Sequence, residues 1–219
     1  MIKLEHVVLA SPEQMEFIIE GMRNRMNSWE KGDSELATAG YDVVGFDLGK
    51  ADHDLMQQLS IAGTDHRKFM RMMPIYVRIT APLYWWKEFD TYKVGTVSNS
   101  CSTMTMHKIQ EKEFTLEDFS IEHLNDDRSA ELSNVEWLEH LIHHLNRDRL
   151  RFIETKNKQY WWQMIQLLPN SYNQTRNVMM NYEVLANIYK SRKSHKLDEW
   201  RDFCKWIEEL PYSELILSA

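Results

Sequence analysis

Residues 74–80 read Pro-Ile-Tyr-Val-Arg-Ile-Thr, and this stretch decides the fold class of the chain. Apolar and polar side chains alternate along it with the period of two that a β-strand with one buried face requires. Pro82, which cannot donate to a strand ladder, ends the pattern. We therefore expect a strand here, in a chain whose remaining patterns are mostly helical.

Toward the N-terminus, residues 4–9 predict a short strand and residues 41–46 a second possible one. Ser11, Pro12 and Gln14 supply an N-cap, a first-turn proline and a capping-box partner, so a helix follows them. Its predicted buried stripe recurs every three or four residues and comprises Met15, Ile18, Ile19, Met22, Met26 and Trp29. Residues 52–62 return to helical character.

Toward the C-terminus, the patterns predict helix after helix, over residues 116–124, 134 to about 168, 171–191 and 197–210. Pro169 and Pro211 separate them, and residues 125–133 are polar enough to form a surface loop. The predicted fold class is α/β (α+β), with a small mixed or antiparallel sheet wrapped by long helices and a helix-rich C-terminal half.

Composition limits the function classes. A chain of 219 residues, 43% of them hydrophobic, can bury one substantial core, so we expect a single domain over residues 1–219. The formal charge of −7 argues against binding a nucleic-acid polymer but permits a free nucleotide. Cys101 and Cys204 are too few for a disulfide framework or a thiolate zinc site, which fits the cytoplasm. No stretch approaches the eighteen apolar residues of a membrane span, so we expect no membrane partner.

Common catalytic signatures are absent: there is no dinucleotide-binding glycine motif, Walker loop, zinc-protease motif or serine-hydrolase elbow. His140, His143 and His144 form a cluster in which the first and last residues have the spacing of two metal ligands on one helix. No third ligand is indicated, and a polar helix face explains the cluster as well. We predict no metal site.

Residues 81–104 mix stacking surfaces, cations and hydroxyls. Lys87 and Lys93 could pair with phosphate, Tyr92 or the tryptophans beside it could stack on a flat ring, and residues 98–103 could offer donors to an anion. A capped helix followed by an ordinary polar turn explains the same residues, and local chemistry does not separate the two interpretations.

The same segment resembles the signature of the flavin-dependent thymidylate synthases, which runs proline, four residues, Arg-Gln, two residues, Arg-His-Arg, two residues, Ser, one residue, Asn-Glu, one residue, Ser, one residue, Arg. In that register, without a gap, the matching positions are Pro82, Lys87-Glu88, Thr91-Tyr92-Lys93, Thr96, Ser98-Asn99, Cys101 and Thr103. Upstream, residues 63–66 stand where the family has a Gly-His-x-Ser element.

The second half extends the resemblance, because the family has a helix that opens with Leu-Pro, carries an asparagine and closes in an arginine. Leu168-Pro169, Asn181 and Arg192 meet these spacings, and the likeness covers roughly residues 60–205. In the family the asparagine contacts flavin and the arginine contacts the pyrimidine of the nucleotide. An exposed helical pair is the alternative interpretation of Asn181 and Arg192.

The resemblance implies two sets of site residues. The residues implied to bind the cofactor, FAD, are Lys87, Thr91, Tyr92, Lys93 and Asn181. Those implied to bind a pyrimidine nucleotide such as dUMP are Glu88, Asn99, Cys101, Thr103 and Arg192. It also implies a methyltransferase using NADPH and methylenetetrahydrofolate if the family chemistry is kept, and a cytoplasmic homotetramer. No side-chain nucleophile is required, because the flavin carries the hydride transfer.

The departures from the signature matter for activity. Thr91, Tyr92 and Lys93 replace Arg-His-Arg, and a lysine cannot reproduce the bidentate guanidinium fork. Thr103 and Ile165 also stand where the family has arginines. Candidate compensating groups are Arg78, Trp85, Trp86 and Lys108. Two hypotheses follow: an enzyme acting on a pyrimidine nucleotide or a changed substrate, and a catalytically inactive homo-oligomer that binds a nucleotide or a protein.

Overall fold

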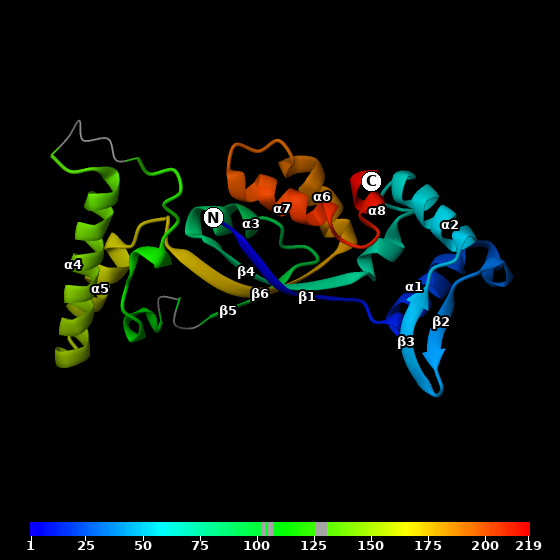
Figure 1. Ribbon diagram of the computed structural model, residues 1–219, viewed down its shortest axis with the longest axis horizontal. Coiled ribbons are helices and arrows are strands. Elements are labelled where there is room, and N and C mark those ends of the chain that lie inside the picture. The colour runs from blue at the N-terminus through cyan, green and yellow to red at the C-terminus, as the bar shows by residue number, and fades with distance from the viewer. Residues whose placement is uncertain (102–103, 105–106, 126–130) are drawn as a thin grey trace. The chain divides into compact units, whose positions relative to one another are not determined.

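The computed structural model describes residues 1–101, 104, 107–125 and 131–219, and its elements are shown in Figure 1. By their contacts the residues form two compact units. The first unit comprises Met1–Lys3, Ile79–Thr91 and Asn99–Asn177, and the second comprises Leu4–Arg78, Tyr92–Ser98 and Val178–Ala219. The expectation of a single domain stays a prediction.

The strands confirm a small sheet. Strands β1 (Lys3–Leu9), β4 (Pro74–Pro82), β5 (Val97–Ser100) and β6 (Asn173–Asn181) form a four-stranded sheet in the order β1-β4-β6-β5. Along β4 the side chains of Ile75, Val77 and Ile79 are buried while Tyr76 and Arg78 are exposed, so the alternation read from the sequence is confirmed. Together with the helices, these strands confirm the α/β class.

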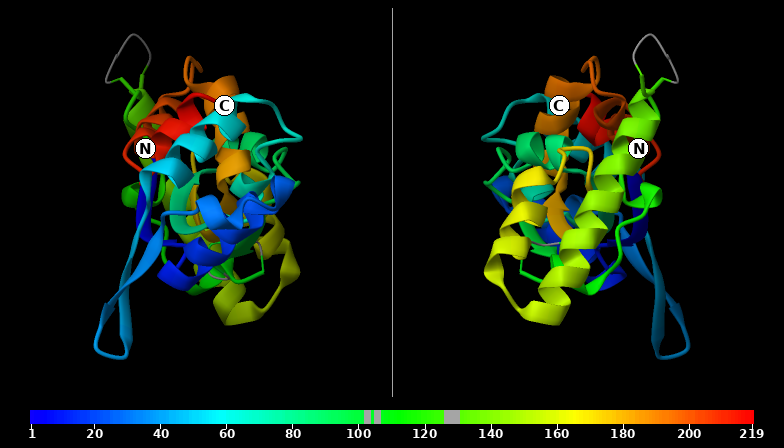
Figure 2. Two further views of the ribbon diagram at one scale, coloured as in Figure 1. Left: turned by 90° about the vertical axis from the view of Figure 1, so that its right-hand side faces the viewer. Right: turned by 90° about the vertical axis from the view of Figure 1, so that its left-hand side faces the viewer.

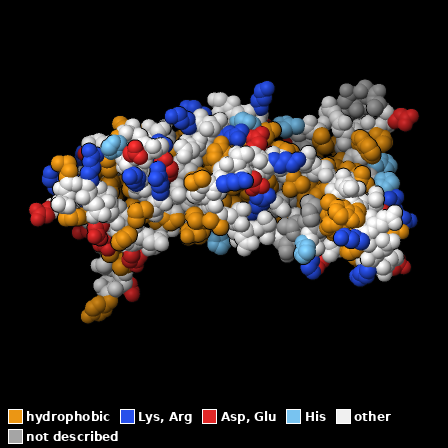
Figure 3. Space-filling model, turned by 180° about the vertical axis from the view of Figure 1, so that it is seen from behind, with side chains coloured by type: hydrophobic (Ala, Val, Ile, Leu, Met, Phe, Trp, Pro, Cys, Tyr) orange, Lys and Arg blue, Asp and Glu red, His pale blue; other side chains and the backbone are white. Residues whose placement is uncertain are grey.

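The second unit contains a separate two-stranded hairpin and most of the helices. Strands β2 (Glu35–Ala39) and β3 (Asp42–Asp47) pair antiparallel, and the hairpin projects as a ribbon in both views of Figure 2. At its tip Tyr41 is fully exposed, and hydrophobic side chains stand out there in Figure 3. The helices of this unit are α1 (Pro12–Arg23), α2 (Lys50–Ile61), α6 (Tyr182–Arg192), α7 (Asp198–Glu208) and α8 (Ser213–Leu217).

Helix α1 begins as expected and ends earlier. Ser11 and Gln14 form the predicted capping box, and Met15, Ile18, Ile19 and Met22 are buried in the core. Met26 and Trp29 are not, with 88% and 48% of their surfaces exposed. The prediction failed there because α1 ends at Arg23 and Met26 has a left-handed backbone, φ 59°, which turns the chain out of the helical register.

The first unit contains α3 (Leu83–Phe89), α4 (Asn134–Thr155) and α5 (Lys158–Leu167). The continuous helix expected from residue 134 to about 168 is wrong, because Lys156 adopts φ 54° and Asn157 caps a new helix by accepting from the Gln159 amide. The core of this unit is an apolar cluster that includes Phe114, Phe119, Leu138, Ile142, Leu145, Met164 and Tyr172.

Two other helix predictions are wrong. Residues 116–124 form only the short 3-10 helix Leu116–Asp118, after which Phe119 is extended and bridges Tyr172. Residues 171–191 divide into strand β6 and helix α6. The strand contains three asparagines, which favour a helix weakly, and its place between β4 and β5 in the sheet order supplies the pairing that decides its conformation.

No helix in the described part of the chain is long and apolar enough to cross a membrane.

Candidate functional site

Arg192, Trp200 and Tyr92 form a cluster within the second unit. Arg192 is the last residue of α6, and its guanidinium carbon lies 4.7 Å from the centre of the Trp200 ring. Its Nε donates a hydrogen bond of 2.9 Å to the Tyr92 hydroxyl oxygen. Trp200 is fully buried in α7, so this side of the guanidinium rests on a rigid aromatic face. The arginine implied to contact a pyrimidine therefore has a fixed position.

Tyr92 is itself held in place. Its ring meets the Trp200 ring edge-on, with 6.0 Å between centres, and its carbonyl accepts a hydrogen bond from the Thr96 hydroxyl. One position of the Arg-His-Arg register is thus used differently: where the family has histidine, the Tyr92 hydroxyl accepts from the arginine at the end of α6. The sequence indicated both residues but not their contact, because they are a hundred positions apart.

Asn181 stands at the other end of α6. It is the last residue of β6 and the N-cap of the helix, where its Oδ1 accepts from the Val184 amide at 2.9 Å. Gly95 approaches this cap so closely that an added Cβ would lie 2.8 Å from the Val184 side chain and 3.1 Å from Asn181 Nδ2. Gly95 also has φ 80°, so both space and backbone favour glycine there. At 1.5 Å per residue, one helix separates Asn181 and Arg192 by about 16 Å.

In the first unit, Lys87, Glu88 and Thr91 make hydrogen bonds within that unit. Lys87 Nζ donates to Asn170 Oδ1 at 2.8 Å, and the Thr91 hydroxyl donates to the Glu88 carbonyl at 2.7 Å, which closes the end of α3. Both bonds are exposed, so a phosphate could displace them at low cost. Lys87 and Glu88 lie in the last turn of α3, and Thr91 follows the helix.

Three of the remaining implied residues are exposed. Lys93 and Asn99 are exposed, in the second and first units respectively. Cys101 is exposed too, and its amide donates to the Thr175 carbonyl at 3.0 Å. Thr103 lies outside the described residues.

Trp85 and Trp86 do not compensate for the lost arginines as ligand-stacking surfaces, because both are buried. They pack against Phe89, and Trp86 Nε1 donates to the Gln174 carbonyl. Lys108 pairs with Glu111 at 2.6 Å, and Arg78 is exposed on β4. The tryptophan that does support a candidate ligand group is Trp200 of α7, which lies in the helix predicted over residues 197–210 but was not among the predicted site residues.

The pKa of the Cys204 thiol, on α7, is affected by the charge of Arg192. Burial raises the pKa of its thiol to about 11, the carboxylate of Glu208 adds to the rise, and the positive charge of Arg192 opposes it. The thiol is therefore protonated at neutral pH and is a probe of the Arg192 charge.

The histidine cluster on α4 gives no support for a metal centre. The rings of His143 and His144 touch edge to face, with centres 6.3 Å apart. Among the residues that the structure describes, no group of three histidine, cysteine, aspartate or glutamate side chains could hold a metal ion.

Comparisons with solved structures extend over nearly the whole chain. Thymidylate synthase X from Helicobacter pylori, in a complex with FAD and dUMP, superposes with a TM-score of 0.64 at 18% identity, covering 99% of this chain and 96% of that one. Another FAD and dUMP complex of that flavin-dependent enzyme gives 0.61 at 17%, with the same coverage. The UMP/dUMP methylase PolB from Streptomyces cacaoi, bound to 5-Br dUMP, gives 0.60 at 11%, covering 100% and 95%.

No protein-family model and no curated protein sequence matches the chain. At these identities the superpositions establish architecture alone. The chain has the fold of the flavin-dependent thymidylate synthases.

Proposed function

We propose that the protein binds a pyrimidine deoxynucleotide, with Arg192 as the principal contact to the base. The observation that carries this proposal is the fixed guanidinium of Arg192, which lies on the buried Trp200 ring and donates to Tyr92. A guanidinium held in one orientation loses little side-chain entropy on binding and presents planar donors that suit the carbonyl oxygens of a pyrimidine. The fold supports the same ligand class, because its solved neighbours bind dUMP or 5-Br dUMP.

We further propose FAD as the cofactor, held at the Asn181 end of α6. Asn181 Oδ1 is occupied by the Val184 amide, which turns the Nδ2 donor toward the Gly95 loop, and an amide donor suits the carbonyl and nitrogen acceptors of a flavin ring. Lys93, which lies in the same unit as Asn181, would supply charge to the phosphates through one bond rather than a bidentate pair. A bound flavin would supply hydride transfer, and with NADPH and methylenetetrahydrofolate it would support methylation of the nucleotide or of a changed substrate.

A second function has an observation of its own. Thr91 and Lys93 provide no guanidinium where the signature has two, and the loss of each charge-assisted contact costs about 1.5–3 kcal/mol. Such losses favour a catalytically inactive protein with the same fold, which binds a nucleotide or a protein without flavin.

An absorbance spectrum of the purified protein, followed by titration with FAD and with dUMP, separates these functions. Flavin bands, or saturable FAD binding that Lys93→Ala weakens, support a flavoprotein and justify an assay for thymidylate formation. Saturable dUMP binding without flavin supports the inactive alternative. Absence of binding to either ligand contradicts the proposal.

The contact between Tyr92 and Arg192 gives the titration its sharpest variant. Tyr92→Phe removes one hydroxyl and keeps the ring on Trp200, so dUMP affinity should fall about threefold to tenfold through looser positioning of the guanidinium. Tyr41→Phe is the matched control, since Tyr41 is fully exposed at the hairpin tip. Equal affinities of the two variants would contradict the assigned role of Tyr92.

We also propose a cytoplasmic homotetramer. Each unit exposes large apolar side chains that an interface would cover: Tyr41, Val44 and Phe17 in the second unit, and Trp137, Leu150 and Trp162 in the first. Light scattering should give about four times the chain mass of 26.2 kDa. A monomeric mass would contradict this assembly and leave the nucleotide proposal standing.

A further inference from the structure

The second unit contains an apolar pocket that the proposed nucleotide site does not use. Its volume is about 250 Å³, and none of the ten residues that line it is charged. The lining comes from the end of β1, the start of α1, β3, the start of β4, the first residue of α6 and the turn before α8. An engineered apolar cavity of about 150 Å³ is enough to hold benzene, so this pocket has room for a larger planar molecule.

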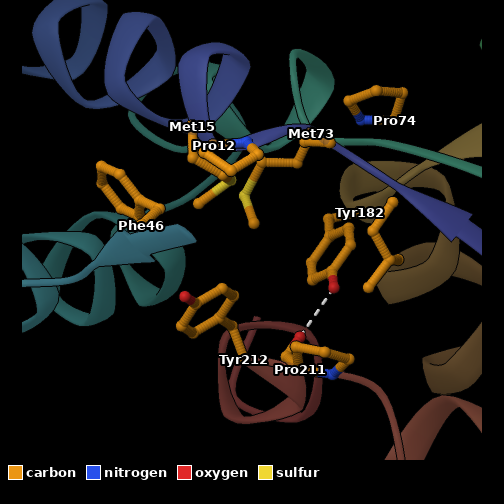
Figure 4. Close-up of a pocket in the computed structure, with 10 residues that line it drawn as sticks. Pro12, Met15, Phe46, Met73, Pro74, Tyr182, Pro211 and Tyr212 are labelled. Carbon is orange, nitrogen blue, oxygen red and sulfur yellow. Dashed lines mark hydrogen bonds between the residues drawn. The ribbon is translucent and has the colours of Figure 1, made fainter. Parts of the chain in front are cut away.

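Aromatic rings and thioethers form the walls, as Figure 4 shows. Phe46 and Tyr182 stand on opposite sides, and the side chains of Met15 and Met73 point into the space between them. Rings offer faces and edges to a flat ligand, and methionine adapts its shape and makes favourable contacts with aromatic edges. These walls suit an aromatic ligand better than a branched aliphatic one.

Tyr182 contributes its ring but not its hydroxyl. The ring is 3% exposed, and the hydroxyl donates to the Pro211 carbonyl at 2.6 Å, shown as the dashed line in Figure 4. Burial raises the pKa of this phenol, so it stays neutral and the hydrogen bond persists. This wall is therefore rigid and presents no polar group to a ligand.

Tyr212 differs from Tyr182. Its ring also lines the pocket, and no hydrogen bond of its hydroxyl is found among the described residues. The residue has a left-handed backbone, φ 57° and ψ 29°, which costs a non-glycine residue about 1–3 kcal/mol and is typical of ligand-binding positions. The pKa of the Tyr212 phenol is raised by burial and by the nearby carboxylate of Glu214. The negative charge of that carboxylate disfavours an anionic ligand beside Tyr212.

We propose that this pocket binds an uncharged aromatic molecule that carries one hydrogen-bonding group, which pairs with the Tyr212 hydroxyl. The ring of the ligand lies between Phe46 and Tyr182, against Met15 and Met73. The proposal is independent of the nucleotide site, because it rests only on the lining and polarity of the pocket.

Indole, indene and indole-5-carboxylate are the probes. They share one bicyclic skeleton, and they differ in the presence of an N–H group and of a charge. With methyl-labelled methionine, the Met15 and Met73 methyl signals, assigned through Met15→Leu and Met73→Leu, should shift saturably with indole, less with indene, and not with indole-5-carboxylate. No shift of either methyl signal with indole overturns the proposal.

Two variants test the pocket itself. Tyr212→Phe should weaken indole binding about threefold to tenfold and leave indene binding unchanged, with Tyr41→Phe as the matched control. A fall in affinity of the same size for both probes would contradict the hydrogen bond. Ala10→Leu, which adds volume at the half-buried rim, should abolish binding of both probes with a circular dichroism spectrum like that of the wild type.

The pocket could instead be covered by a second copy of the chain. In that case Ala10→Leu would lower the mass measured by light scattering, and indole would fail to shift the methionine signals of the intact assembly. This pair of results would overturn the proposed small-molecule site.

Discussion

Each unit stacks an arginine on a buried tryptophan, and the two stacks differ in what surrounds them. In the first unit, the Arg176 guanidinium carbon lies 4.1 Å from the centre of the Trp86 ring, and its nitrogens donate to Asp90 at 2.6 Å and to Gln174 at 2.8 Å. In the second, the Arg192 guanidinium lies 4.7 Å from Trp200 and donates to the Tyr92 phenol.

The position of each arginine in its element separates the two roles. Arg176 lies in the middle of β6, and its side chain is 13% exposed, so its contacts fasten α3 to the strand. Arg192 is the last residue of α6, and its partners come from a loop and from the following helix α7. Similar chemistry thus serves packing in one unit and, in our proposal, ligand binding in the other.

Removing either tryptophan should have the largest effect. Trp86→Ala and Trp200→Ala each empty a fully buried site, and each should lower the free energy of unfolding by about 3–5 kcal/mol. Urea denaturation at equal protein concentration measures this loss. Trp137→Ala is the matched control because that ring is 60% exposed. If either variant lost less stability than Trp137→Ala, the two buried tryptophans would not contribute equally to stability.

Replacing the arginines should separate the two stacks in binding. Arg192→Ala should weaken dUMP binding about tenfold to a hundredfold, the effect of one charge-assisted hydrogen bond, while Arg176→Ala should leave the affinity unchanged. Arg151→Ala is a further control, because that exposed arginine lies over the Tyr160 ring without any assigned ligand role. Isothermal titration measures all three. Equal losses of dUMP affinity for Arg192→Ala and Arg151→Ala would contradict the proposed contact between Arg192 and the base.

For stability we expect the opposite order, with a larger loss for Arg176→Ala than for Arg192→Ala. Arg176→Ala removes a cation–π contact and the bonds to Asp90 and Gln174, and should lower the free energy of unfolding by about 1–2 kcal/mol. The ion pair adds little to this loss, since the side chain of Asp90 is 52% exposed. Urea denaturation of Arg176→Ala and Arg192→Ala side by side checks the order. A greater loss for Arg192→Ala would mean that its stack, too, serves mainly packing.

The sequence predicts the elements best where a local signal is decisive. The alternation of residues 74–80 and the capping box of Ser11 and Gln14 are both confirmed, because each depends on neighbours in the chain. Strand β6 was mistaken for a helix because its apolar residues also fit a helical spacing, and only pairing with distant strands decides between the two. The break at Lys156 was missed because a lysine rarely takes a left-handed backbone.

The candidate site shows the same limit. The signature register indicated Tyr92 and the likeness of the second half indicated Arg192, but their hydrogen bond and the contact of Arg192 with Trp200 depend on how α6, α7 and a loop fold together. The apolar pocket could not be predicted from the sequence. Phe46, Met73 and Tyr212 come from segments far apart in the chain, and no local pattern indicates that they lie close together.

The smallest expected effect concerns the pKa of Cys204, which depends on the charge of Arg192 and not on that of Arg176. Its folded pKa of about 11 lies above the ordinary thiol value of 9.0 through burial first, and the charge of Arg192 limits the rise. Because the unfolded thiol ionises first as pH rises, the stability it contributes is complete below pH 9 and is lost between pH 9 and 11. Comparing wild type with Cys204→Ala isolates this loss from that of the buried tyrosines.

Arg192→Ala should raise the Cys204 pKa further, by less than about one unit or 1.4 kcal/mol, since the removed charge favours the thiolate. Arg176→Ala should leave it unchanged, because the charge of Arg176 is not among the causes of the shift. Ultraviolet titration of the thiolate in a Cys101→Ser background measures both. An equal pKa in the two arginine variants would mean that the charge of Arg192 does not act on Cys204. That result would contradict the fixed position of the guanidinium beside α7, on which the nucleotide proposal depends.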